Sequence, residues 1–98
     1  MAVGDVVSEI TSVAKDAYLD IQPGAGAEWV IHNIYYQDKV TVEFYDGSNS
    51  IVFFTDLSAE AGMLAFHAFH CNNGHRIRIC NKHAADAKLL GYDGIVTK

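Results

Sequence analysis

The feature that most constrains this chain is a series of short apolar segments that end in turn sequences about every ten residues, a spacing typical of compact all-β domains. Residues 23–27 (PGAGA), 46–49 (DGSN) and 73–74 (NG) are turns of this kind. Proline fixes φ, and glycine and asparagine tolerate positive φ, so these residues can reverse the chain. The pattern predicts an all-β fold, either an antiparallel sandwich or a small barrel. Of these we expect a β-sandwich of jelly-roll type.

About seven strands are expected from the alternation of apolar runs and turns, over residues 17–22, 28–37, 39–45, 50–55, 65–72, 75–81 and 87–92. Strict alternation along the second of these strands places Ile31 on one face and Ile34 on the other. The third strand alternates cleanly, and with the fourth it predicts a hairpin over residues 40–55.

Three further local predictions concern the second half of the chain. Asn73-Gly74 predicts a hairpin that joins residues 65–72 to 75–81, because a type I′ turn needs positive φ at both positions. Residues 56–64 are expected to form a loop with a helical turn near 58–63. Asp93-Gly94 is expected to be a turn before a short tail.

The first sixteen residues differ from the rest and are treated as a segment of their own, with the sandwich domain over residues 17–98. Their apolar side chains fall near helical spacing: Val3, Val6, Val7, Ile10 and Val13. β-Branched residues weaken a helix, however. Residues 1–16 therefore form either a short helix packed on the domain or an extended arm that becomes ordered on a neighbouring subunit.

Length and charge exclude several classes of protein. A chain of 98 residues is expected to form one domain. The net charge is −5, and only Arg76 and Arg78 lie close together among the basic residues, so direct nucleic-acid binding is not expected. No apolar run reaches the ~18 residues of a membrane span. Cys71 and Cys80 are too few for a secreted disulfide scaffold, which indicates reduced thiols and folding inside the cell.

The richest set of potential metal ligands lies between residues 66 and 83: His67, His70, Cys71, His75, Cys80 and His83. In the expected hairpin only His67 and Cys80 are direct neighbours. Cys71 would lie four residues further along, roughly 13 Å away at the usual rise of a strand. That separation is too large for a disulfide or for a shared zinc ion. We therefore expect no metal and no other cofactor.

Catalytic motifs are equally scarce. The sequence contains no Gly-x-Ser-x-Gly elbow, no P-loop and no His-Glu-x-x-His. Asp46 and Asp56 could be imagined as paired carboxylates, but acidic residues in loops are more often solvated turn residues. We expect no catalytic residue and no enzymatic activity.

Aromatic residues are abundant for a thin sandwich. Neighbouring rings, as in Tyr35-Tyr36, must point to opposite faces of a strand, whereas a sandwich buries only one face of each sheet. Exposed apolar surface usually marks an interaction site. We therefore expect contacts between subunits at Trp29, Tyr35 and Tyr36. Two alternatives remain, namely that loops cover the rings internally, or that the rings form a platform for sugars.

Several segments together resemble a family of small virion proteins of tailed bacteriophages, some of which are decoration or cement proteins. They are residues 18–23 (YLDIQP), 28–34 (EWVIHNI), 45–47 (YDG), 75–78 (HRIR) and 90–94 (LGYDG). The similarity spans roughly residues 17–98. It implies a protein made in the host cytoplasm and located on the capsid surface, where it binds the major capsid protein, commonly as a homotrimer. In that setting the segment with Val3, Val6, Val7, Ile10 and Val13 is expected to grip the shell.

A second function class stays open at this point. The aromatic residues also fit a carbohydrate-binding or receptor-binding β module of a tail or head fibre. Such a module would place rings on a concave face beside polar side chains, whereas a decoration protein has no need of a glycan.

Overall fold

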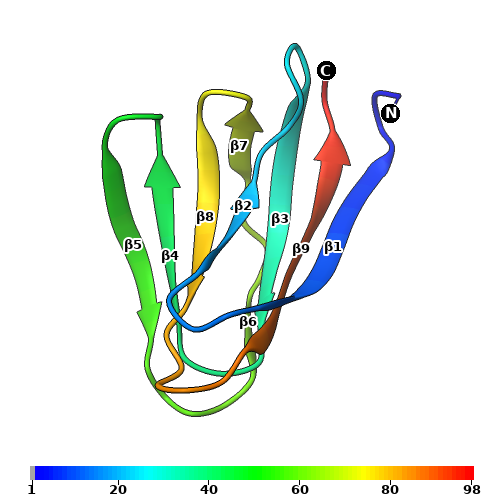
Figure 1. Cartoon of the computed structure of the whole chain (residues 1–98). Coiled ribbons are helices and arrows are strands. Elements are labelled where there is room, and N and C mark those ends of the chain that lie inside the picture. The colour runs from blue at the N-terminus through cyan, green and yellow to red at the C-terminus, as the bar shows by residue number, and fades with distance from the viewer. Residues whose placement is uncertain (1) are drawn as a thin grey trace.

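The computed structural model describes residues 2–98, which form nine strands and two antiparallel sheets (Figure 1). In chain order the strands are β1 (Val6–Val13), β2 (Tyr18–Ile21), β3 (Glu28–Tyr36), β4 (Val40–Tyr45), β5 (Ser50–Asp56), β6 (Gly62–Leu64), β7 (Phe69–Asn72), β8 (Arg76–Asn81) and β9 (Lys88–Val96). We name the five-stranded sheet β1-β9-β3-β6/β7 sheet A and the four-stranded sheet β2-β8-β4-β5 sheet B. None of the described residues form a helix long and apolar enough to cross a membrane.

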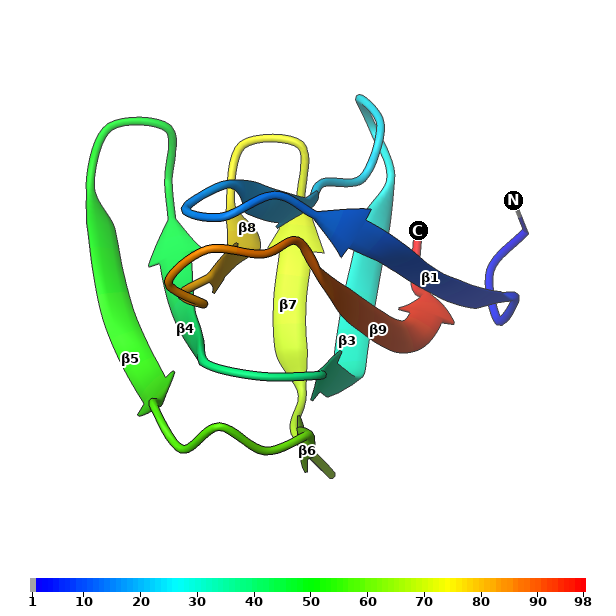
Figure 2. The same cartoon turned by 60° about the horizontal axis from the view of Figure 1, so that its bottom comes forward.

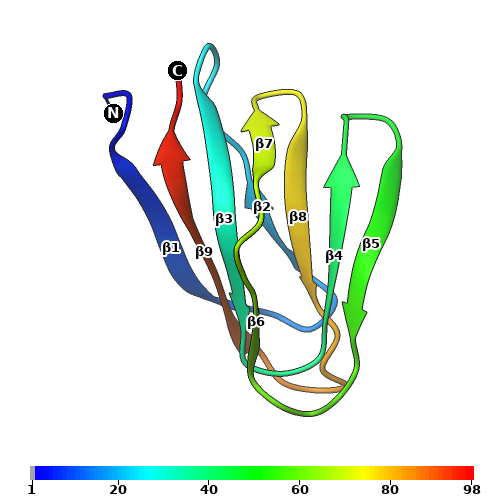
Figure 3. The same ribbon diagram turned by 180° about the vertical axis from the view of Figure 1, so that it is seen from behind.

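The strand order is that of a jelly roll. β6 and β7 pair with opposite ends of β3, so they take one position in sheet A (Figure 3). The chain alternates between the sheets except at the β4–β5 hairpin and within the β6–β7 pair, which gives a sandwich of interleaved strands. β5 and β1 lie on opposite sides of the molecule (Figure 2). The predicted all-β antiparallel sandwich is confirmed.

The core lies between the sheets and consists mainly of β-branched side chains, which suit a pleated surface. Its fully buried aliphatic residues are Ile21, Ile31, Ile34, Val40, Val42, Ile77, Ile79, Leu90 and Val96. The side chain of Asn81 is also buried, and its amide donates to the carbonyls of Val13 and Asp86. Because both donors of this amide are used, Asn81 joins β8, β1 and the loop before β9 without an unpaired polar group.

Over residues 2–16, the described part of the N-terminal segment, the helix considered for residues 1–16 does not form. Residues 6–13 are β1, an edge strand of sheet A that pairs with β9 along its whole length. Val7 and Val13 are six positions apart, so they share the inner face of a strand, and both are buried. The apolar spacing that suggested a helix therefore combines residues from both faces of an extended strand, as the β-branched composition favours.

The strict alternation predicted along β3 is wrong. The register between β3 and β9 shifts between Ile31 and Asn33, and Ile31 and Ile34 are both fully buried. A β-bulge adds one residue to one strand, so side chains on either side of it can face the same way although their spacing is odd.

The predicted hairpin of residues 65–81 is also wrong. β7 pairs with β3 in sheet A, whereas β8 pairs with β2 and β4 in sheet B. The turn itself is tight, because the Asn72 amide donates to the His75 carbonyl and the Asn72 side chain accepts from the amides of Gly74 and His75. A local turn signal therefore reverses the chain but does not decide whether the two strands pair or cross between sheets.

The region around Asp93-Gly94 is not a turn, because β9 runs through it without interruption. A Cβ atom on Gly94 would lie 2.1 Å from the carbonyl oxygen of Val30. Glycine is therefore required for the close approach of β3 and β9 and not for a reversal of the chain. In the β5–β6 connection, the expected helical turn is absent and the short strand β6 forms, whereas the β4–β5 hairpin is confirmed.

Candidate interaction surfaces

The outward side of sheet A carries the first candidate surface, which we call the outer apolar face. Val6 and Ile10 on β1 are 72% and 71% exposed, and they alternate with the buried residue Val7. On β9 the residues at the same side of the pleat are Leu89 and Ile95, both exposed. The face is completed by β3 and β6, and its members are Val6, Ile10, Tyr35, Met63, Leu89 and Ile95.

A polar network lies at the centre of this face. The Asp93 carboxylate accepts hydrogen bonds from the Asn33 amide at 2.7 Å and from the Tyr35 hydroxyl at 2.5 Å. The hydrogen bond to Asp93 raises the pKa of Tyr35, with partial desolvation as a second cause. Because each oxygen of Asp93 accepts a hydrogen bond, the carboxylate fixes two side chains of β3.

An apolar pocket of about 200 Å³ opens beside this network. It lies where β1, β9 and β3 meet the loop before β6. Its lining residues are all uncharged: Ile10, Tyr35, Tyr36, Gln37, Ala61, Leu89, Leu90 and Gly91. The pocket can therefore receive an apolar group from a partner but has no charge with which to bind an ion.

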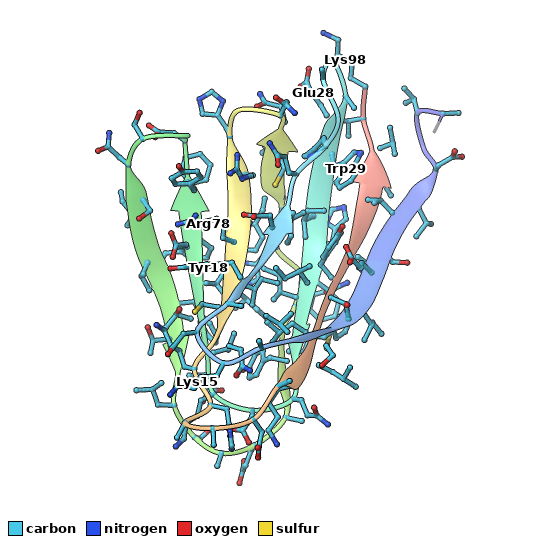
Figure 4. All side chains as sticks on the ribbon, in the orientation of Figure 1. Lys15, Tyr18, Glu28, Trp29, Arg78 and Lys98 are labelled. Carbon is cyan, nitrogen blue, oxygen red and sulfur yellow. The ribbon has the colours of Figure 1, made fainter. Side chains whose placement is uncertain are left out.

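The three residues expected at a subunit interface do not form one surface. Tyr36 is buried, packs against Phe54 and donates its hydroxyl to Asp56. Trp29 points to the inner side of sheet A and stacks on Tyr92 (Figure 4). Only Tyr35 belongs to the outer apolar face, because the bulge in β3 and the pleat turn the other two rings inward.

The residues expected to form an arm that grips the shell are likewise divided between the core and the surface. Val7 and Val13 are core residues of the sandwich. Val3, Val6 and Ile10 are exposed, and two of them belong to the outer apolar face. The segment therefore offers a partner one face of a paired strand and not a free arm.

The outward side of sheet B has a different chemistry. The guanidinium of Arg78 lies over the rings of Tyr18 and Tyr45, at 4.3 and 4.0 Å, and forms an ion pair with the buried Glu43 at 2.7 Å (Figure 4). Arg76 pairs with Asp20 beside it. These charges are matched and the rings of Tyr18 and Tyr45 lie against cations, which makes the part of this side over β2, β8 and β4 polar. The edge strand β5 differs, because Ile51 and Val52 are exposed.

A cleft of about 440 Å³ lies between the two sheets near the β7–β8 turn. Its ring-bearing residues are Trp29, Phe44, Phe69 and His75, and the rings of Phe44 and His75 stack at 6.3 Å. Trp29 Nε1 is buried and has no hydrogen-bond acceptor among residues 2–98. The cleft is the second candidate site, with an unused donor in an aromatic setting.

The potential metal ligands of residues 66–83 are dispersed. Cys71 lies in sheet A and Cys80 in sheet B, and both thiols are free and buried. The expected pairing of His67 with Cys80 is wrong, because β7 and β8 belong to different sheets. Burial raises the pKa of Cys71 to about 11, which keeps it a neutral thiol. Over residues 2–98, no group of three or more His, Cys, Asp or Glu side chains converges in a way that could hold a metal ion.

Sequence reasoning missed Leu89, Ile95 and Met63. A signal existed for two of them, because Leu89, Gly91, Asp93 and Ile95 share one face if the strand continues through Asp93-Gly94. This alternation was not recognised because a turn was assumed at Asp93-Gly94. Comparison with known proteins adds no assignment, since no family model and no curated protein sequence matches the chain.

Proposed function

We propose that this chain is a non-enzymatic structural protein of a tailed-phage virion, a decoration or cement protein that binds the major capsid protein on the capsid surface as a homotrimer. The outer apolar face of sheet A is the observation that carries the proposal. Jelly-roll domains occur in viral capsids and lectins. The resemblance of residues 17–98 to small phage virion proteins supports the same assignment.

The two outward sides of the sandwich suit different surroundings. The outer apolar face exposes Val6, Ile10 and Leu89 to water, and contiguous apolar surface of this kind favours burial against another protein. The outer side of sheet B carries the matched ion pairs of Arg78 and Arg76. A protein fixed to a shell by sheet A would thus turn its charged side to solvent.

A decoration protein works by mass action. A ligand that binds the assembled shell but not its separated subunits stabilises the shell in proportion to the logarithm of its free concentration relative to Kd. No proton transfer or bond cleavage is required. The engaged carboxylate of Asp93, with both oxygens bonded, fits this structural role.

The test uses heads of the phage whose genome encodes this chain, grown with the gene deleted. Purified chain is added and the heads are sedimented. We expect saturable binding and heads that release their DNA at a higher temperature. Heads from phage grown with the intact gene are the control and should take up no further chain. If heads from the phage that lacks the gene do not bind the chain, the proposal is contradicted.

A second candidate function is glycan binding in the cleft between the sheets. It is favoured by the aromatic side chains of Trp29, Phe44 and His75, which line the cleft. A glycan array probed with the purified chain would show binding that Phe44→Ala abolishes. An array without hits would leave the capsid role as the better account.

A further inference from the structure

Phe66 is the most unusual residue on the surface. It lies between β6 and β7, its side chain is 95% exposed, and its φ is 61°. A bulky residue rarely adopts positive φ, and a fully hydrated phenyl ring gains nothing from the hydrophobic effect. The positive φ costs free energy in the isolated chain and burial of the ring offsets none of it, which indicates that the ring has a use outside the chain.

Hydrogen bonds hold the loop around Phe66 in place. Its amide donates to Asn33 Oδ1 at 3.1 Å, and Asn33 is fixed in turn by Asp93. The next amide, that of His67, donates to the His32 carbonyl at 3.0 Å, and His32 Nδ1 donates back to the His67 carbonyl at 2.7 Å. The ring therefore projects from a backbone that is already ordered, so binding it would require little further loss of entropy.

A pocket of suitable size for such a ring lies on the same chain. The apolar pocket bounded by Ile10, Tyr35 and Leu89 has a volume of about 200 Å³. An apolar cavity of about 150 Å³ is large enough to take up benzene. The pocket is open to solvent on one side, so a phenyl ring of a partner can enter it, and its volume is sufficient for one ring. Phe66 does not fill it within its own chain, because its side chain is almost fully exposed.

Charge does not prevent a second copy from supplying the ring. The chain carries a net charge of −5, so two copies repel each other over most of their surfaces. The residues that line the pocket are uncharged. Residues 63–70, which surround Phe66 in the sequence, contain no Asp, Glu, Lys or Arg. Ring and pocket can meet without bringing like charges together.

We propose that Phe66 of one copy inserts into the Ile10–Tyr35–Leu89 pocket of a second copy and that this contact builds the oligomer. The inference rests on the proposed function, because it identifies the contact through which the decoration protein would self-associate. Each copy offers one ring and one pocket at different places. Such a head-to-tail contact closes into a ring when its rotation permits, and the trimer is the ring expected here.

The test compares molar masses by light scattering at equal chain concentration. Phe66→Asn removes the ring, and asparagine tolerates positive φ, so the loop is not strained by the change. Leu89→Glu places a charge in the pocket at a half-exposed position. We expect a trimer for the natural chain and monomers for both variants. Ile51→Ala, which removes an equally apolar exposed group from β5, is the matched control and should remain trimeric.

Mixing the two variants gives the sharper result. The Leu89→Glu chain still has its ring and the Phe66→Asn chain still has its pocket, so an equimolar mixture should form a 1:1 heterodimer. A natural chain that is monomeric, a Phe66→Asn chain that still forms trimers, or a mixture that stays monomeric would overturn the inference. Circular dichroism and thermal unfolding confirm that each variant is folded.

Two outcomes separate the contact between copies from the capsid role. If the natural chain binds phage heads but Phe66→Asn does not alter its oligomeric state, the ring-and-pocket contact is wrong and the capsid role stands. If the variants dissociate as expected but the natural trimer does not bind heads, the contact stands and the capsid role is wrong.

Discussion

Single residues in this molecule are constrained most tightly where β3 and β9 meet. Gly94 has the carbonyl of Val30 where its Cβ atom would be, and Asp93 beside it fixes Asn33 and Tyr35. Gly94 thus allows β3 and β9 to pack closely. Its neighbour Asp93 orders the centre of the outer apolar face. Packing and surface chemistry are therefore coupled at this point of the sheet.

The close approach at Gly94 leads to a stability prediction. In Gly94→Ala the new Cβ would lie 2.1 Å from the Val30 carbonyl oxygen, so the two strands must separate. We expect a loss of about 1–3 kcal/mol in the free energy of unfolding, as for other overpacked interiors. Urea unfolding measures it. Gly24→Ala is the control, since nothing lies within 4 Å of a Cβ there, and it should unfold like the natural chain. Equal midpoints for the two variants would contradict the close packing.

Buried tyrosines predict the response to alkaline pH. Burial, with a hydrogen bond to Asp56, raises the pKa of Tyr36 from 10.0 to about 12, and burial beside Glu9 raises the pKa of Tyr92 to about 12. The folded chain thus keeps these protons at pH values where the unfolded chain loses them. Their contribution to stability is complete below pH 10 and is lost as the pH rises toward 12.

Urea unfolding at a series of pH values checks this sign. The free energy of unfolding should fall between pH 10 and pH 12. The double variant Tyr36→Phe, Tyr92→Phe should show a smaller fall over that range, because it lacks the two phenols. A natural chain whose stability rises over the same range would refute the assignment.

At the scale of elements, local signals predicted local structure and failed where pairing is long-range. The β4–β5 hairpin follows from alternation and the Asp46–Asn49 turn, and it formed. The Asn73-Gly74 turn also formed, but its strands pair elsewhere, because β3 and β4 compete successfully for β7 and β8. The identity of a strand's neighbour depends on the whole sandwich and cannot be read from the turn.

Most of the residues that were predicted on the wrong face result from a wrongly assigned repeat of apolar side chains along a strand. In β1 the valines and Ile10 fit both a helical and a strand period, and only pairing with β9 selects the strand. In β3 the bulge at Ile31 shifts every later side chain, which put Tyr36 inside instead of outside. A bulge leaves no distinct mark on a sequence, so these faces could not have been predicted from alternation alone.

β1 carries a prediction that separates folding from binding. Replacing Val6 and its β9 neighbour Ile95 by serine keeps β1 in the sheet, since the buried residues Val7 and Val13 are untouched, and neither position lines the apolar pocket. We expect near-normal urea unfolding but a loss of binding to phage heads in the sedimentation assay. Ile51→Ser on β5 is the control and should bind normally. Undiminished binding by the double variant would exclude the outer apolar face as the contact.

Deleting residues 1–16 is a different experiment. It removes an edge strand, two core valines and the carbonyl that accepts from Asn81. β9 would then expose its backbone and its apolar side chains, which favours aggregation. We expect insoluble or unfolded chain, so loss of binding in that variant would say nothing about the contact surface.

The whole molecule is a sandwich with two unlike sides. Sheet A presents exposed aliphatic side chains, an uncharged pocket and the ring of Phe66. The outward side of β2, β8 and β4 in sheet B presents arginines already paired with carboxylates and rings, and exposed apolar residues of sheet B are concentrated on its edge strand β5. The two sides of the sandwich therefore differ in the chemistry of their outward side chains. Under the proposed function we expect the molecule to turn sheet A toward protein partners and the ion pairs of sheet B toward water.

The proposed function requires that a phage encodes this chain, and the most direct test of the expected orientation is electron microscopy of purified particles of that phage, at a resolution that traces strands. We expect density for the chain on the outside of the head, with the outer apolar face of sheet A covered by capsid protein or by a second copy and with sheet B facing solvent. Density that leaves Val6, Ile10 and Leu89 in water, or particles without the chain, would contradict it.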